Sequence, residues 1–330
     1  MIPALDDDVL SQFANDVEEG LTARQKNISP KYFYDDYGSK LFEQICTQPE
    51  YYPTRTEYDI IKDNVDTIVK IYANSEISLI ELGSGNSKKT RIILERFLEK
   101  KKDSVYYFPI DVSKDILQET SFELNTEFPK LNTRYIPAEY IDGIVQVKKL
   151  IDKNNYIPKK GIILFLGSSL GNLEPTYAID FLKNIKKNIT QIDLLLIGLD
   201  LHKDKQILEK AYNDKAGATA KFNLNVLKRI NKELSGEFDL NQFEHFAFYN
   251  KEQGRIEMHL KSLQEQNVKI NYLDRVFYFS KNETIHTENS YKYSIGDLKD
   301  LFFKSGFTIN KMFTDKNNWF SLSLLKPITN

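Results

Sequence analysis

One stretch in the first third of the chain most constrains the fold: an apolar segment, two closely spaced glycines and then a helix. The apolar segment covers residues 77–82, and Gly83 and Gly85 follow it. Asn86 or Ser87 can cap a helix whose apolar residues recur at helical spacing. Because glycine has no Cβ, a strand, turn and helix of this kind bring backbone N–H groups close to a ligand.

The next apolar segment suggests what that ligand is. Residues 106–112 read as a second strand, with Asp111 near its carboxyl end. A carboxylate at this place suits the two ribose hydroxyls of a nucleoside. Lys88 stands where the dinucleotide fingerprint has a third glycine, which disfavours NAD. The pattern therefore predicts a nucleoside ligand, and an ordinary βα turn without a ligand is the alternative.

Strand-like and helix-like segments alternate from residue 77 to residue 199. The expected strands cover residues 77–82, 106–112, 134–136, 161–166 and 194–199. The last two are nearly all apolar, as expected when helices cover both faces of a parallel sheet. This alternation predicts a doubly wound α/β sheet that binds its ligands at the carboxyl ends of its strands.

After residue 200 the pattern changes to helical segments and then to strand-like alternation. Residues 205–235 are expected to be helical, and the segments after them have the pattern of a hairpin and further strands. These strands are expected at residues 243–249, 255–263, 268–279 and 284–291, before a last helix near 296–305 and strands at 307–313 and 319–325. We expect a cofactor-binding domain of residues 56–202 and 293–330, and an α+β substrate-binding domain of residues 1–55 and 203–292.

Composition disfavours several classes of protein. The chain has 45 basic and 47 acidic side chains, which argues against a dedicated nucleic-acid binder. We expect neither a signal peptide nor a membrane span, since no apolar stretch has the required form or length. The single cysteine, Cys46, fits a reducing cytoplasm. The four histidines show no metal-ligand spacing, so no metal is expected.

Two other segments offer substrate contacts. A glycine-containing stretch, residues 167–175, follows the fourth strand and presents Asn172 beside the expected nucleoside. Asn172 could instead cap the next helix. Tyrosines gather around turns within residues 31–55, and each offers an apolar face and a polar tip. They either line a ligand site or pack a lid helix onto the core.

Together these segments resemble the histidine-specific, S-adenosylmethionine-dependent methyltransferases of ergothioneine biosynthesis, which form hercynine. The resemblance runs from about residue 31 to the C-terminus. It rests on residues 31–39, 49–55, 80–90, 164–175, 211–225, 243–245, 256–258 and 287–290. It implies a class I methyltransferase (Rossmann-like) sheet with an inserted substrate-binding domain, and three methyl transfers to the α-amine of free L-histidine. We expect a cytoplasmic monomer that binds no nucleic acid and no membrane.

The resemblance also implies roles for individual residues. The implied S-adenosylmethionine contacts are Gly83, Lys89, Asp111, Glu139 and Tyr140. The family usually has Asp-Phe where this chain has Glu139 and Tyr140, a change that keeps the charge and the aromatic ring. The implied substrate contacts are Tyr51, Asn172, Tyr212, Met258, Glu288 and Ser290, with Tyr34 and Tyr51 as the catalytic tyrosines.

The implied chemistry suits these side chains. Methyl transfer is an in-line displacement at a sulfonium carbon, so alignment and desolvation supply much of the catalysis. Asn172 and Tyr212 can donate hydrogen bonds to the substrate carboxylate, and Glu288 can accept one from an imidazole N–H. Tyrosine faces can accommodate the cationic product. The alternatives are a methyltransferase for another amino acid such as tryptophan, and a non-catalytic cofactor-binding module.

Overall fold

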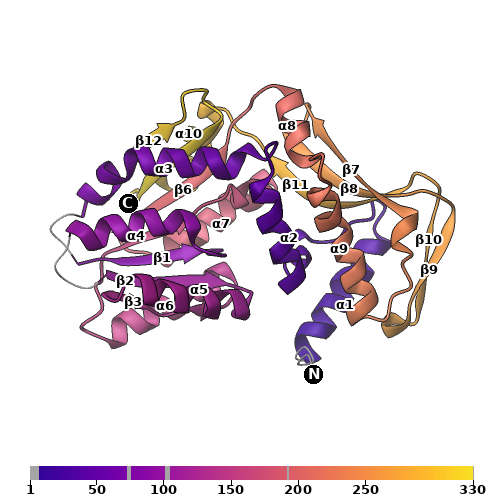
Figure 1. Cartoon of the computed structure of the whole chain (residues 1–330), viewed down its shortest axis with the longest axis horizontal. Coiled ribbons are helices and arrows are strands. Elements are labelled where there is room, and N and C mark those ends of the chain that lie inside the picture. The colour runs from indigo at the N-terminus through magenta and orange to yellow at the C-terminus, as the bar shows by residue number, and fades with distance from the viewer. Residues whose placement is uncertain (1–6, 73–75, 101–104, 192, 330) are drawn as a thin grey trace. The chain divides into compact units, whose positions relative to one another are not determined.

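The computed structural model describes residues 7–72, 76–100, 105–191 and 193–329. It consists of two compact units, each built from separate stretches of the chain (Figure 1). The insertion unit comprises Met1–Tyr51 and Asp204–Ser290, and the sheet unit comprises Tyr52–Lys203 and Tyr291–Asn330. The chain therefore crosses from one unit to the other three times. The assignment of substrate binding to the first unit stays a prediction.

The sheet unit is organised around an eight-stranded sheet with the order β12-β13-β6-β5-β1-β2-β3, in which β4 also pairs with β2. Its strands are β1 Ser78–Leu82, β2 Val105–Asp111, β3 Leu131–Thr133, β4 Ile136–Pro137, β5 Gly161–Phe165, β6 Leu194–Asp200, β12 Phe307–Thr314 and β13 Phe320–Pro327. The pairings from β6 to β3 are parallel, whereas β13 is antiparallel to both β6 and β12. Strand order reverses at β1, and such a switch point is where doubly wound sheets bind ligands.

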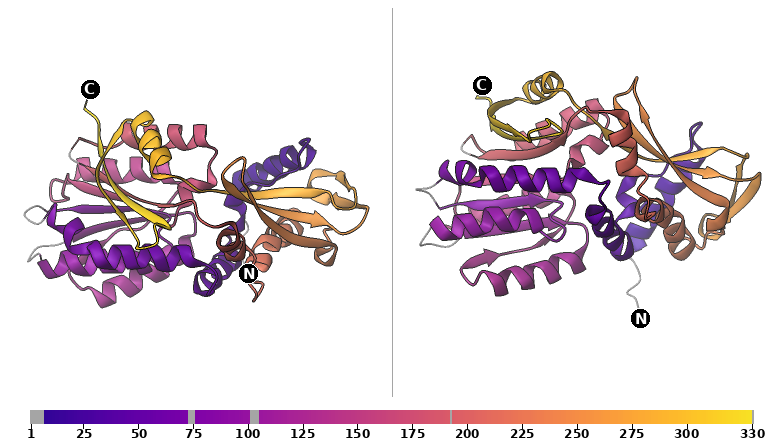
Figure 2. Two further views of the ribbon diagram at one scale, coloured as in Figure 1. Left: turned by 90° about the horizontal axis from the view of Figure 1, so that it is seen from above. Right: turned by 45° about the horizontal axis from the view of Figure 1, so that its top comes forward.

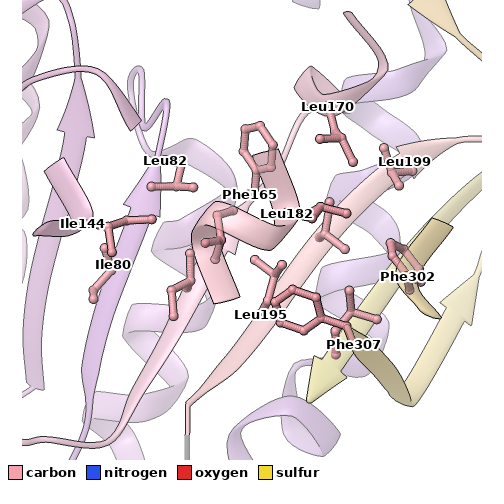
Figure 3. Packing of buried hydrophobic residues seen from close by; sticks show 14 of the residues in the cluster. Ile80, Leu82, Ile144, Phe165, Leu170, Leu182, Leu195, Leu199, Phe302 and Phe307 are labelled. Carbon is pink, nitrogen blue, oxygen red and sulfur yellow. The ribbon is translucent and has the colours of Figure 1, made fainter. Parts of the chain in front are cut away.

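Helices cover both faces of this sheet, as Figure 2 shows. They are α3 Tyr52–Lys70, α4 Lys88–Lys100, α5 Lys114–Glu127, α6 Tyr140–Lys153, α7 Pro175–Lys187 and α10 Ile295–Lys304. Successive strand residues point to opposite faces, so Leu79 packs with α3, α4 and α5 while Ile80 packs with α6, α7 and α10. Figure 3 shows the second of these clusters, where Ile80 and Leu195 lie among helix side chains. The confirmed fold class is therefore the expected α/β sheet covered on both faces.

The insertion unit combines helices with short antiparallel sheets. Its helices are α1 Asp7–Thr22, α2 Asp36–Thr47, α8 Lys205–Tyr212 and α9 Ala218–Glu233, with 3₁₀ turns η1 Pro30–Phe33, η3 Leu240–Gln242 and η4 Asn271–Leu273. Its strands are β7 Phe243–Asn250, β8 Arg255–Ser262, β9 Gln266–Ile270, β10 Arg275–Phe279 and β11 Thr284–Tyr291. They form a three-stranded sheet, β11-β8-β7, and a hairpin of β9 and β10.

Three expected elements differ from the structure. The strand expected at 134–136 is two short strands, β3 and β4, because Arg134 and Tyr135 are exposed and leave the ladder between them. The strand expected at 268–279 is a hairpin, since the chain turns through η4 and Asp274 takes a left-handed conformation. The helix expected at 205–235 is broken before Gly217, which is also left-handed. Across the described ranges, no helix has both the length and the apolar character needed to cross a membrane.

Candidate active site

The glycine turn after β1 has the backbone geometry that the sequence predicts. Gly83 and Gly85 have φ angles of 67° and 49°, a region that side chains with a Cβ rarely adopt. The backbone N–H of Gly83 donates to Ile110 O at 2.8 Å, which ties the turn to the end of β2. A Cβ on Gly83 would lie 3.2 Å from Tyr140 Oη. Glycine at this position therefore lets the turn pass close to Tyr140.

Asp111 lies at the carboxyl end of β2, next to the glycine turn. Its Oδ2 accepts a hydrogen bond from the Gly85 N–H at 3.1 Å, and its Oδ1 accepts one from Ser113 N at 3.0 Å. Burial raises the pKa of Asp111, although these backbone donors oppose the shift. The structure thus brings Gly83 and Asp111, two of the predicted cofactor residues, to one edge of the sheet.

Glu139 and Tyr140 begin α6, the helix after β4. Glu139 is the exposed N-cap residue, whereas the half-buried Tyr140 ring packs edge-on against Phe165 at 5.4 Å between centroids. Burial, and then the charge of Asp111, raise the pKa of the Tyr140 phenol, so it stays protonated. Tyr140 therefore offers an aromatic ring beside Gly83, and its contact with the adenine stays a prediction.

Lys89 stands in the first turn of α4 and is held by Glu57, a fully buried residue of α3. Lys89 Nζ donates to Glu57 Oε2, and the Gly167 N–H donates to both oxygens of the same carboxylate at 3.0 and 2.8 Å. Glu57 thus connects a predicted cofactor residue to the loop after β5. Sequence reasoning missed Glu57, since a single acidic residue on a helix gives no local signal of this role.

Asn172 ends the 3₁₀ turn Ser169–Asn172 in the loop after β5. The N-cap of α7 is Glu174, so Asn172 does not occupy the capping position that the alternative interpretation assigned to it. Ser168 has a left-handed φ of 61°, and its Oγ accepts from the Asp200 N–H at 3.0 Å. Because β5 pairs in parallel with β1, this loop lies at the same sheet edge as the glycine turn.

A second buried carboxylate, Glu81, lies one residue before the end of β1. Thr90 Oγ1 donates to its Oε1 at 2.5 Å, and Tyr107 Oη donates to its Oε2. Burial raises the pKa of Glu81 to about 7, even though these two donors oppose the change. Glu81 therefore connects β1, α4 and β2 directly beneath the glycine turn.

The insertion unit groups the predicted tyrosines around aromatic neighbours. Tyr51 lies edge-on to Tyr212 at 6.1 Å between ring centroids, and Phe42 lies between Tyr51 and Tyr34 at 6.3 and 5.7 Å. Burial raises the pKa of Tyr51 well above its ordinary value, and Tyr212, Cys46, Tyr34 and Glu288 add to the rise. Tyr51 is thus a neutral phenol that can donate a hydrogen bond and cannot serve as a phenolate base at neutral pH.

Two of the other predicted substrate residues, Ser290 and Glu288, lie next to the tyrosines, and the third, Met258, lies on β8. Tyr212 Oη donates to Ser290 Oγ at 2.7 Å, and Glu288 is buried and close enough to Tyr51 to influence its pKa. Met258 on β8 is buried, and its carbonyl accepts from Thr287 Oγ1 at 3.0 Å. The structure therefore places Tyr34, Tyr51, Tyr212, Met258, Glu288 and Ser290 in the insertion unit, and Asn172 in the sheet unit.

Comparison with known proteins identifies the family of the chain. The sequence profile of the family described as "Histidine-specific methyltransferase, SAM-dependent" matches residues 13–327. A histidine N-alpha-methyltransferase of Mycolicibacterium smegmatis is 36% identical over 318 residues, which cover 96% of each chain. An ergothioneine biosynthesis protein 1 of Schizosaccharomyces pombe is 30% identical over 84% of this chain and 36% of its own length. An L-tryptophan methyltransferase of Psilocybe serbica is 28% identical over 89% of this chain and 86% of its own.

The match to the profile spans nearly the whole chain. The chain therefore belongs to the histidine-specific, S-adenosylmethionine-dependent methyltransferases.

Proposed function

We propose that this enzyme transfers three methyl groups in succession from S-adenosylmethionine to the α-amino group of free L-histidine, which yields hercynine for ergothioneine biosynthesis. The observation that carries the proposal is the cluster in the insertion unit. There a hydrogen-bonded pair, Tyr212 and Ser290, adjoins buried Glu288 and neutral Tyr51. Carboxylate, hydroxyl and aromatic groups of this kind match an imidazole and an amine that becomes a cation.

The sheet unit offers the residues that would hold the cofactor. Tyr140 leaves little room for a side chain at Gly83, and Asp111 presents a carboxylate beside the turn. We assign Asp111 to the ribose hydroxyls, Glu139 and Tyr140 to the adenine, and Lys89 to a further contact. S-adenosylmethionine supplies an electrophilic methyl group when bound, and the residues of the chain orient the acceptor.

Substrate orientation follows from the chemistry of each side chain. Asn172 and Tyr212 donate hydrogen bonds to the carboxylate of histidine, and Glu288 accepts one from its imidazole while Ser290 serves the other ring nitrogen. Tyr34 and Tyr51 present aromatic faces to the α-amine as it becomes a quaternary ammonium, an attraction of roughly 0.5–2 kcal/mol. Because its pKa is raised, Tyr51 acts as a neutral ring and hydrogen-bond donor.

We further propose that the enzyme is a cytoplasmic monomer whose partners are small molecules. The near balance of 45 basic and 47 acidic side chains supports the absence of nucleic-acid binding.

Mass spectrometry tests the proposed reaction. The enzyme is incubated with S-adenosylmethionine and each of the common amino acids in separate reactions. Histidine alone should give a trimethylated product, whereas histamine, which lacks the carboxylate, should give little or none. A chain that bound S-adenosylmethionine in calorimetry but methylated no amino acid would be a non-catalytic module, and the proposal would fail.

The similarity to a tryptophan methyltransferase makes a second acceptor worth testing. Glu288 rejects an amino acid that leaves its buried carboxylate unpaired, and Met258 fills volume that an indole would need. Glu288→Ala combined with Met258→Val should lower histidine turnover and admit tryptophan. Steady-state kinetics on both amino acids measure the change, and an unaltered preference for histidine would assign the specificity to other residues.

A further inference from the structure

Three side chains outside the methylation chemistry gather on the sheet of the insertion unit. Glu257 and His259 are alternate residues of β8, and His286 lies on the neighbouring strand β11. Each offers one metal-binding atom, and these three atoms lie within 4.8 Å of one another. The spacing of the histidines in the sequence gave no sign of this group, because its members come from two strands.

The buried imidazole of His259 lacks a partner for one of its nitrogens. Its side chain is 9% exposed, and the described residues provide no hydrogen bond to Nδ1. Its other nitrogen, Nε2, lies 3.2 Å from Glu257 Oε2. One imidazole gives a metal ion only one of its nitrogens, so an ion shared with Glu257 would take Nε2, the nitrogen that faces this carboxylate, in place of the hydrogen bond.

The surrounding residues orient the other two groups. Arg255 Nε and Asn250 Nδ2 both donate to Glu257 Oε1 at 2.9 Å, and Oε2 is directed to His259. His286 Nε2 lies 2.9 Å from Asn289 Oδ1. Such outer hydrogen bonds fix the orientation of metal ligands in proteins.

The distances require only small side-chain movements to hold an ion. Ligands of tetrahedral zinc, at about 2.0–2.1 Å from the metal, lie about 3.4 Å from one another. Glu257 Oε2 and His259 Nε2 already have nearly this separation, and the rings of His259 and His286 lie 4.9 Å apart between centroids. Imidazole and carboxylate ligands favour zinc and its neighbours in the transition series over calcium or magnesium.

We propose that Glu257, His259 and His286 bind a divalent transition-metal ion, zinc by its ligand preference, which joins β8 to β11. Water completes the coordination, and Asn289 stays the outer hydrogen-bond partner of His286. Arg255 offsets the charge of Glu257, so the empty site is close to neutral.

The position of the site also relates it to substrate choice, a consequence that rests on the proposed function. Met258 stands between Glu257 and His259, and Glu288 follows His286 by two residues. An ion that joins the two strands would fix the backbone of both specificity residues. It would act as a positioning element, without contact to the reacting groups.

Metal titration of the full chain, freed of chelator and of any histidine tag, tests the site. Co²⁺ should bind with one equivalent per chain and give a visible absorption band. Zn²⁺ should displace the bound Co²⁺ and remove this band. Zn²⁺ should also raise the melting temperature by several degrees. Neither readout depends on methyltransferase activity, so their failure is distinct from failure of the proposed function.

Matched variants locate the ion. His286→Gln should reduce Co²⁺ affinity at least tenfold and abolish the thermal shift, while its melting temperature without metal stays near that of the unmodified chain. His202→Gln removes an exposed histidine of the sheet unit and should leave both readouts unchanged. Absence of Co²⁺ and Zn²⁺ binding to the unmodified chain, or equal binding by His286→Gln, would overturn the proposal.

Discussion

Glu57→Gln removes the charge that holds Lys89 while keeping the volume of the side chain. Both Glu57 oxygens accept from Gly167 N, and one also pairs with Lys89. Removal of one partner from a fully buried ion pair costs about 3–5 kcal/mol. Glu57 is fully buried, but 20% of the Lys89 side chain is exposed, so water compensates in part and we expect about 2–3 kcal/mol.

This loss should be visible in both stability and cofactor affinity. For a unit of about 190 residues, each kcal/mol lowers the melting temperature by about 2–4 °C, so a fall of about 4–12 °C is expected. Lys89 and the loop at Gly167 lose their common anchor, and we expect the affinity for S-adenosylmethionine to fall about tenfold, roughly 1.4 kcal/mol. Differential scanning fluorimetry and titration calorimetry measure the two effects.

Asp63→Asn is the control, since Asp63 is an exposed acidic residue of the same helix. It should change neither the melting temperature nor the cofactor affinity. If Glu57→Gln melts at a lower temperature but binds S-adenosylmethionine normally, Glu57 is structural and Lys89 does not contact the cofactor. If neither quantity changes, the argument from the buried ion pair is wrong.

Three further predictions follow from the same unit. Asp111→Ala should weaken S-adenosylmethionine binding about 10- to 100-fold, because ribose hydroxyls lose a charged acceptor worth roughly 1.5–3 kcal/mol per bond; unchanged affinity in a folded variant would remove Asp111 from the site. Asn172→Ala should raise the KM for histidine far more than it changes cofactor affinity, and equal changes in both would contradict a contact to the substrate carboxylate. The pKa of Glu81 rises on folding from 4.5 to about 7, because burial outweighs its hydrogen bonds. The folded state therefore binds the extra proton between these values, and Glu81 contributes less stability as the pH rises through that window. Glu81→Gln should thus gain about 2–4 kcal/mol of unfolding free energy relative to the unmodified chain between about pH 5 and about pH 8. Urea unfolding at both pH values measures this gain, and a pH-independent difference would refute it.

The parallel sheet could be predicted because its central strands carry their own signal. β5 and β6 are buried along their whole length and read as nearly all apolar segments in the sequence. The proximity of Gly85 to Asp111 could also be predicted, since adjacent parallel strands end at one edge. The short strands β3 and β4 could not, because two or three residues are too few to show alternation.

Side-chain partners from distant segments were beyond prediction for a different reason. Glu57 meets Lys89 and Gly167 only after α3 packs on the sheet, and His259 meets His286 only when β8 pairs with β11. Neither contact has a periodic or local signature. Asn172 and the tyrosines of residues 31–55 were suggested by their own segments. Tyr212, Met258, Glu288 and Ser290 were accessible to reasoning only through the resemblance to a family, since their order along the chain shows nothing about which of them meet.

Asp200 of the sheet unit binds residues that lie next to the places where the chain passes from one unit to the other. Asp200 ends β6 and is almost fully buried; Tyr52 Oη, Lys203 Nζ and Lys292 Nζ lie 2.6, 2.5 and 2.9 Å from its carboxylate. Although burial raises the pKa of Asp200, the two lysines hold it below its ordinary range. Each partner stands within two residues of one of the three places where the chain crosses between units. One carboxylate of the sheet unit therefore anchors all three crossings. Since the ends of the insertion are fixed on the sheet side, a substitution inside the insertion unit need not disturb the strands that end at Gly83 and Asp111.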